Sequence, residues 1–231
     1  MDRMFQRIMR GLVETGRAPH YAELARALGL PTDEGRLILH DVMQAYPIGW
    51  LHPETDYIAS FPPLNNLPTQ YRISARGEQR WFAQCGFEAT SVTWLFPGET
   101  VRIDAPCLDC GDPVTVEMRD GRIVWLDPPG IVGHLNYGFG ASRGKPQFLC
   151  TGMNLFRSEE HARRWPAFQA RAAEGFITLV ELAGFFGTET RRHMLDADYL
   201  STWYPRRAAE RRAYLESIGK TTPFWFGTPD A

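Results

Sequence analysis

The order of the hydrophobic patterns along the chain is the feature that most constrains its fold. Apolar residues recur at helical spacing across residues 3–14, and two further helical patterns follow them. Residues 48–51 and 57–61 then alternate as two short strands around a turn. Three helices followed by a hairpin predict a winged-helix-like module over residues 1–61.

A module of this kind invites a DNA-binding interpretation, which its charge opposes. Residues 1–60 contain six arginines and no lysine against eight acidic residues, so their net charge is −2. The third helical pattern, which would enter a major groove, carries Asp33, Glu34 and Asp41. Phosphate binding requires the opposite balance. We therefore expect a structural or lid module without a nucleic-acid partner, and DNA binding is the minor alternative.

Strand patterns dominate the middle of the chain. Three alternating segments between residues 100 and 126 predict strands, and Asp120-Gly121 is a two-residue hairpin signal between the last two. Ahead of them, apolar residues predict a helix from about Gly77 to Val92, interrupted or kinked at a glycine.

These patterns predict an α+β protein. The three-helix winged-helix-like module is followed by a mixed, largely antiparallel β-sheet core flanked by helices. The proline-rich residues 62–70 predict a linker, the core extends over residues 71–195, and residues 196–231 form a basic and aromatic extension. The glycine-rich residues 136–146 predict a loop.

Cysteine usage and the N-terminus bear on the compartment and the chemistry. The sequence has no apolar run long enough to span a bilayer, and no apolar signal core follows its first residues, so we expect a cytoplasmic protein without membrane contact. Four cysteines in such a protein indicate metal binding, catalysis or plain burial rather than a disulfide scaffold. They are Cys85, Cys107, Cys110 and Cys150.

Cys85 and Glu88 are the first candidate pair. Residues three apart share one face of a helix, so this spacing places a soft nucleophile beside a carboxylate that can accept or donate a proton. Cys150 follows the glycine-rich loop and is the candidate second thiol. The competing interpretation is two buried core cysteines and a solvated glutamate.

Cys107 and Cys110 form a Cys-x-x-Cys in a predicted β-turn, similar to half of a zinc ribbon. A complete site needs two further ligands, and the sequence has no second Cys-x-x-Cys. The histidines at 134, 161 and 193 are not at metal-ligand spacing. A structural turn is the favoured interpretation, and metal binding is the alternative.

Several segments resemble the organomercurial (alkylmercury) lyases. The resemblance covers residues 70–195 and includes Arg80-Trp81-Phe82-Ala83-Gln84-Cys85-Gly86-Phe87-Glu88, Leu95-Phe96-Pro97-Gly98, Phe148-Leu149-Cys150, and Arg191-Arg192-His193-Met194-Leu195. In that family two cysteines and an aspartate cleave the carbon–mercury bond, and a third cysteine is structural. The resemblance therefore implies a carbon–mercury lyase.

Carried onto this chain, the resemblance makes Cys85 and Cys150 the working thiols, which would also hold the mercury, and Cys107 the structural cysteine. Glu88 stands where the family has its aspartate, with one additional methylene. No cofactor is implied. The substrate is a small organomercurial, and Hg(II) is the bound product, to be passed to low-molecular-weight thiols or a thiol-bearing reductase.

The mechanistic hypothesis is that Glu88 deprotonates one thiol and later protonates the carbon bound to mercury. An apolar pocket, with Phe82 and Phe87 as candidate walls, would keep its acid form near neutral pH. Two alternatives stay open. The same groups could act on a substrate without mercury, or the cysteines could bind or sense a soft metal ion without catalysis.

Overall fold

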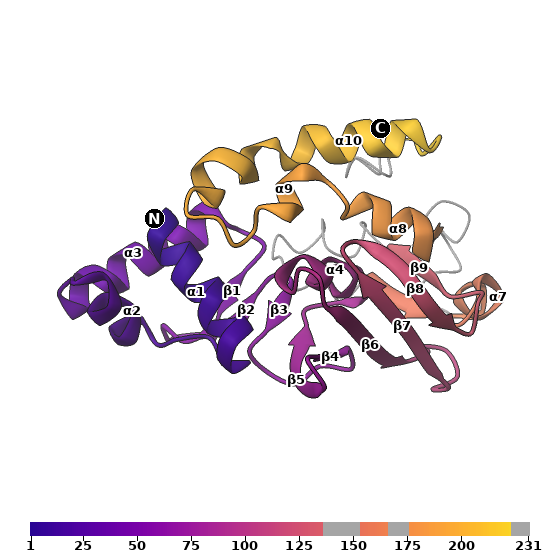
Figure 1. Cartoon of the computed structure of the whole chain (residues 1–231), viewed down its shortest axis with the longest axis horizontal. Helices are drawn as coiled ribbons and strands as arrows, with labels where there is room; N and C mark the ends of the chain where they lie inside the picture. The colour runs from indigo at the N-terminus through magenta and orange to yellow at the C-terminus, as the bar shows by residue number, and fades with distance from the viewer. Residues whose placement is uncertain (136–152, 166–175, 223–231) are drawn as a thin grey trace.

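The computed structural model describes residues 1–135, 153–165 and 176–222, and it confirms the α+β class (Figure 1). Within these residues, eight strands form one sheet in the order β1-β2-β3-β5-β4-β6-β7-β8, and three form a second sheet in the order β10-β9-β11. The strand pairs are antiparallel.

The first part of the chain forms α1 (Asp2–Thr15), α2 (Tyr21–Leu28), α3 (Thr32–Ala45), β1 (Trp50–Leu51), β2 (Ile58–Phe61) and β3 (Leu64–Asn65). The middle part forms β4 (Arg72–Ala75), β5 (Glu78–Ala83), α4 (Gly86–Ser91), the 3-10 helix η1 (Val92–Leu95), β6 (Thr100–Pro106), β7 (Pro113–Arg119), β8 (Arg122–Asp127) and β9 (Val132–Leu135). The last part forms β10 (Met153–Phe156), α7 (Glu159–Arg164), β11 (Phe176–Thr178), α8 (Leu179–Phe185), α9 (Glu189–Arg192), the π-helical turn η3 (Tyr199–Trp203), the 3-10 turn η4 (Tyr204–Arg206) and α10 (Arg207–Ser217).

The helix predicted over residues 3–14 is α1, and its apolar positions form one buried stripe. This stripe consists of Met4, Phe5, Ile8, Met9, Leu12 and Val13. Gly16 ends the helix at φ 73°, a left-handed conformation in which its N–H donates to the Leu12 carbonyl. Helices α2 and α3 and the β1–β2 hairpin follow in the predicted order.

The segment predicted as a linker, residues 62–70, contains part of the main sheet. Strand β3 pairs with β2 on one side and with β5 on the other, so it joins the N-terminal hairpin to the rest of the sheet. Residues 64–65 of the predicted linker are thus a strand of the sheet. The proposed domain limits at residues 1–61, 71–195 and 196–231 stay predictions.

The helix predicted over residues 77–92 is wrong in its first half, where β5 forms instead. Arg76 and Gly77 have φ values of 55° and 78°, and this left-handed pair turns β5 back onto β4. Strand β5 also pairs with β3, so the sheet takes the backbone hydrogen bonds that a helix would have used. As a result Cys85 precedes a short helix, α4, rather than lying within a long one.

The strands predicted between residues 100 and 126 are confirmed as β6, β7 and β8. Asp120 and Gly121 form the predicted turn, with φ values of 48° and 77°. Gly121 also lies under the Trp94 ring, where a Cβ would come within 2.1 Å of a ring carbon. Along β6 the buried residues Val101, Ile103 and Ala105 alternate with more exposed ones, as the period of a half-buried strand requires.

The C-terminal segment packs against the N-terminal helices (Figure 1). Gln6 Nε2 donates to the Leu195 carbonyl at 3.0 Å, and the rings of Phe5 and Tyr199 stack with centroids 4.8 Å apart. Helix α10 lies in the extension predicted over residues 196–231. Residues 223–231 of the extension lie outside the described residues.

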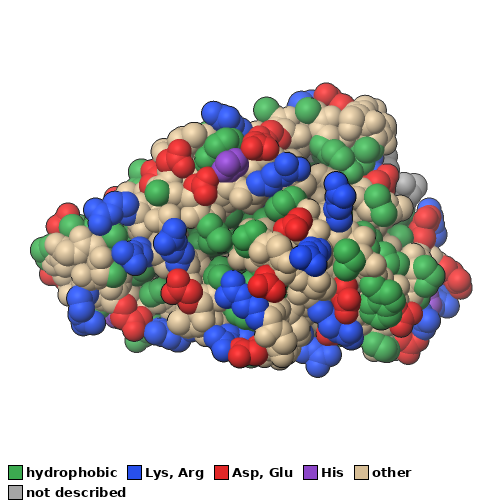
Figure 2. Space-filling view, viewed as in Figure 1, with side chains coloured by type: hydrophobic (Ala, Val, Ile, Leu, Met, Phe, Trp, Pro, Cys, Tyr) green, Lys and Arg blue, Asp and Glu red, His purple; other side chains and the backbone are tan. Residues whose placement is uncertain are grey.

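Charge is mixed over the surface. On the face shown in Figure 2, basic and acidic side chains are interspersed rather than separated by sign, including over the N-terminal helices. This distribution agrees with the expectation of no nucleic-acid partner, which stays a prediction. Among the described residues, none of the helices has the length and apolarity needed to cross a membrane.

His134 is a titratable group in the core. It lies on β9 with 1% of its surface exposed, and its ring packs edge-to-face on Phe176 with centroids 4.8 Å apart. Burial, with a smaller contribution from the positive charge of Arg163, lowers the pKa of His134 to about 4.

We predict that His134 makes the free energy of unfolding fall as the pH decreases from about 6.5 to about 4. In this range the unfolded imidazole binds a proton and the folded one does not, so acid favours the unfolded state, by about 2 to 3 kcal/mol in total. Urea unfolding of the wild type and of His134→Gln, at about pH 7.5 and about pH 4.5, measures the difference. An equal loss in both proteins would contradict this prediction.

Candidate active site

Cys85 is held at the junction of β5 and α4. It is the N-cap residue of α4, with extended backbone, and its Sγ accepts a hydrogen bond from the Glu88 N–H at 3.4 Å. Only 1% of its surface is exposed. An N–H donor directed at sulfur stabilises the negative charge that the sulfur carries when it binds a metal ion.

Strand β10 packs against Cys85. Met153 Sδ lies 3.9 Å from Cys85 Sγ. A Cβ on Gly86 would come within 2.9 Å of Leu155 Cγ and 3.1 Å of Tyr71 Oη, so the absence of a side chain there allows α4 to approach this strand. Burial, followed by the nearby Cys85, raises the pKa of Tyr71, whose hydroxyl donates to Asn154 Oδ1 at 3.0 Å.

Glu88 is buried in the first turn of α4 and has a partner on each carboxylate oxygen. Arg191 Nη2 on α9 lies 2.7 Å from Oε1, and Ser91 Oγ donates to Oε2 at 3.1 Å. The side chains of Arg191 and Glu88 are 3% and 9% exposed. Burial on its own would lower the pKa of Arg191, but the charge and hydrogen bond of Glu88, together with Tyr46 and Tyr199, outweigh it and the pKa is raised.

The expectation of an apolar pocket around the Glu88 carboxyl is therefore wrong. Phe82 is only partly buried, and Phe87 points towards Gly133, where its ring edge would lie 2.7 Å from an added Cβ. The Glu88 carboxyl instead contacts the guanidinium of Arg191, which is always charged and would otherwise be unpaired in the interior.

Cys150 lies outside the described residues, as does the predicted 136–146 loop. The described chain resumes at Met153, three residues after Cys150. Of the predicted catalytic set, the structure brings Cys85 and Glu88 together in one helical turn.

Sequence patterns did not assign a role to Arg191, Ser91, Tyr71 or Met153. Ser91 has the i+3 spacing from Glu88 that could have indicated a contact. Arg191 is 103 residues from Glu88, and no local signal links residues so far apart.

Cys107 and Cys110 lie together at the turn between β6 and β7, the former buried and the latter exposed. His161, on α7, has a ring nitrogen close to both sulfurs, and the three ligand atoms all lie within 4.8 Å of one another. The expectation that the histidines are unrelated to this motif is therefore wrong for His161, because β10 brings α7 back to the turn.

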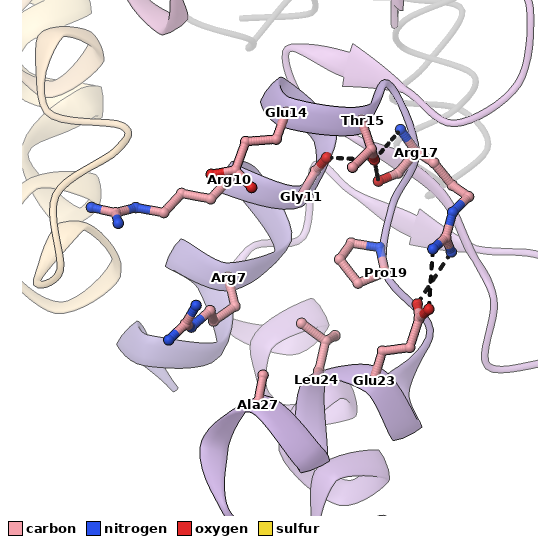
Figure 3. Close-up of a pocket in the computed structure, with 10 residues that line it drawn as sticks. All are labelled: Arg7, Arg10, Gly11, Glu14, Thr15, Arg17, Pro19, Glu23, Leu24 and Ala27. Atoms are coloured by element: carbon pink, nitrogen blue, oxygen red, sulfur yellow. Dashed lines mark hydrogen bonds and ion pairs between the residues drawn. The ribbon is translucent and has the colours of Figure 1, made fainter.

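A separate pocket of about 280 Å³ lies between α1 and α2 (Figure 3). Its charged lining residues are of both signs, and Arg17 pairs with Glu23 at its edge. None of the cysteines that the structure describes lines it, so we assign it no part in the chemistry of those thiols.

Comparisons with known proteins give one family. A family model described as alkylmercury lyase matches residues 64–190, more than half of the chain. A solved structure described as the mercury-bound form of MerB2 is similar over 85% of this chain and 91% of that chain, with a TM-score of 0.63 and 20% identity, which supports a common fold. Comparison with curated proteins gives no match.

We predict that Arg191→Met lowers the free energy of unfolding by about 3–5 kcal/mol, because it leaves a buried carboxylate without its partner. The double variant Glu88→Gln/Arg191→Met should lose less than either single variant, since it leaves neither charge alone. Urea unfolding of the four proteins measures the coupling. The control is Arg17→Met, which removes an exposed ion pair and should cost less than about 1 kcal/mol. Losses of the same size at both positions would contradict the prediction.

Proposed function

Because this chain belongs to the alkylmercury lyase family, we propose that its carbon–mercury lyase activity is carried by Cys85, Glu88 and Cys150. The supporting observation is the single turn that presents the buried Cys85 sulfur and the buried Glu88 carboxylate on the first residues of α4. A thiol supplies the soft ligand that mercury prefers, and the carboxylate supplies a proton acceptor and donor.

In the proposed reaction the two thiols replace the carbon ligand of R–Hg⁺. Each sulfur binds mercury as a thiolate and gives up a proton. One proton passes through Glu88 to the carbon as the carbon–mercury bond breaks, and the electron pair of that bond forms the new C–H bond. The other proton goes to solvent. The products are R–H and Hg(II) bound by two thiolates, and no oxidant or reductant is required.

The Glu88–Arg191 contact determines how the carboxylate would take part. An ionised carboxylate is ready to accept a thiol proton, and metal coordination drives that proton off the sulfur. Once protonated, Glu88 would lie beside the positive charge of Arg191, which favours loss of the proton to the developing carbanion. Arg191 is thus a positioning residue, and it lies where an apolar pocket was expected.

The assignment of Cys150 rests on its place in the sequence. An extended chain covers the three residues from Cys150 to Met153 in about 10 Å. Met153 Sδ is itself 3.9 Å from Cys85 Sγ. A second thiol on this segment is therefore within chain reach of Cys85.

Release of Hg(II) from two thiolates requires exchange to other thiols. Low-molecular-weight thiols, or a thiol-bearing reductase, are the proposed acceptors, and the cytoplasm, where such thiols are abundant, is the proposed compartment.

We predict that the full-length protein releases benzene from phenylmercury in the presence of excess thiol, measured by gas chromatography. Cys85→Ser and Cys150→Ser should release none above background, because one sulfur cannot replace the carbon ligand and hold the product. Glu88→Gln should slow release by about 10²- to 10⁴-fold, the usual contribution of a proton-transfer group. Glu99→Gln, at an exposed carboxylate, is the matched control and should leave the rate unchanged.

Stability has to be separated from chemistry, because Glu88→Gln leaves Arg191 unpaired. The double variant Glu88→Gln/Arg191→Met removes that buried charge and should remain inactive. Undiminished release from Cys150→Ser would refute the two-thiol site. Tight Hg(II) binding without hydrocarbon release would instead support a soft-metal-binding or sensing protein. The absence of both Hg(II) binding and hydrocarbon release would support a substrate without mercury.

A further inference from the structure

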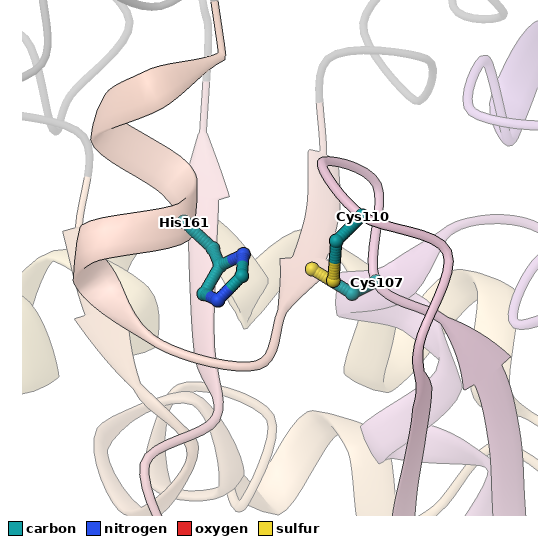
Figure 4. Close-up of side chains that lie close together, drawn as sticks. All are labelled: Cys107, Cys110 and His161. Carbon is teal, nitrogen blue, oxygen red and sulfur yellow. The ribbon is translucent and has the colours of Figure 1, made fainter.

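A second group of metal-ligating side chains lies apart from Cys85 and Glu88. Cys107 and Cys110 come from the β6–β7 turn and His161 from α7, and Figure 4 shows the imidazole directed towards the two sulfurs. Strand β10 separates the two groups: Met153, at its start, contacts Cys85, while Arg157, just past its end, contacts Cys107. Four residues of strand correspond to about 13 Å.

The turn itself is shaped to present both sulfurs. The Cys107 N–H donates to the Asp112 carbonyl at 2.7 Å, and the Gly111 N–H donates to the Cys107 carbonyl at 2.9 Å. Gly111 has φ 76°, a left-handed conformation that reverses the chain directly after Cys110. The Arg157 N–H reaches Cys107 Sγ at 3.5 Å. This closed turn holds the two cysteine sulfurs close together without a disulfide between them.

His161 is oriented by its own partners. It lies in the first turn of α7, whose N-cap Ser158 accepts a hydrogen bond from the His161 N–H. Asp109, between the two cysteines in the sequence, has Oδ2 2.8 Å from His161 Nδ1. A carboxylate bound to a ring nitrogen holds the imidazole in place, as the outer partners of metal-ligating histidines do.

The charges around the group balance with a divalent cation. Two thiolates would neutralise such an ion, and the negative charge of Asp109 is matched by Arg164, whose Nη2 lies 3.0 Å from Asp109 Oδ2. The same Nη2 lies 2.7 Å from Nδ1 and 3.2 Å from Nε2 of His161, so the guanidinium must move slightly from the ring when the imidazole binds metal. Arg164 is half-exposed and can do so.

We propose that Cys107, Cys110 and His161 form a Zn²⁺ site, with the fourth position open to solvent. Two thiolates and one imidazole are a standard zinc ligand set. Bonds of about 2.3 Å in tetrahedral geometry bring ligand atoms to about 3.8 Å from each other, which needs only a small closure of a group already within 4.8 Å. The ion would fasten the β6–β7 turn to α7. This proposal does not depend on the lyase chemistry.

The test is metal binding by the full-length protein, reduced with a phosphine and without any organomercurial. Titration with Co²⁺ should give the thiolate-to-cobalt and d–d absorption bands of a tetrahedral site, at one equivalent, and Zn²⁺ should abolish them. Cys110→Ser and His161→Ala should remove the bands or weaken binding by at least about 100-fold, and Asp109→Asn, which acts through His161, by about 10- to 100-fold. Cys110 and His161 are chosen because the buried Cys107 could be needed for folding.

Two further variants assign the binding to this group. Cys85→Ser should retain the absorption bands, since it alters only the other thiol site. His52→Ala, the matched histidine control, should also retain them. Bands that are lost in Cys85→Ser, or that persist at full affinity in Cys110→Ser, would overturn the proposal, as would the absence of Co²⁺ and Zn²⁺ binding by the wild type.

Discussion

The buried ion pair between Glu88 and Arg191 is the interaction on which the arrangement of this protein depends. It joins α4, which carries Glu88 and begins directly after Cys85, to α9, where Arg191 is 103 residues from Glu88. Both groups are buried, and each provides the partner that the other would lack in the interior. Helix α9 is followed in the chain by η3, whose Tyr199 stacks on Phe5 of α1. The ion pair therefore connects α4 to the C-terminal segment that packs on the N-terminal helices.

Strand β10 lies between the two groups of cysteines. One end of the strand faces Cys85, and the chain just past the other end faces Cys107. The register of β10 is set by its pairing with β9. The close approach of α4 to β10 at Gly86 sets the distance between the strand and the helix. Two separate sites that contain cysteines can therefore coexist in one small protein without sharing residues. One is buried beside a carboxylate, and the other is partly exposed beside an imidazole.

Local patterns predicted much of the fold. The stripe of α1 and the Asp120-Gly121 hairpin are signals that short-range physics determines, and the structure has both. The prediction failed over residues 77–92, where apolar spacing favoured a helix. Pairing with β4 and β3 overrode it, because a strand between two partners satisfies its backbone hydrogen bonds on both edges.

The sequence alone determined which chemical groups are available: the thiols, the carboxylate at position 88, the Cys-x-x-Cys turn and the segments that resemble the alkylmercury lyases. The surroundings of those groups depend on how the chain folds. The tertiary structure placed Cys85 at a helix start, paired Glu88 with Arg191 rather than with an apolar pocket, and brought His161 to Cys107 and Cys110. The physical reason is that charge, desolvation and ligand geometry depend on contacts between residues far apart in the chain, which local spacing does not encode.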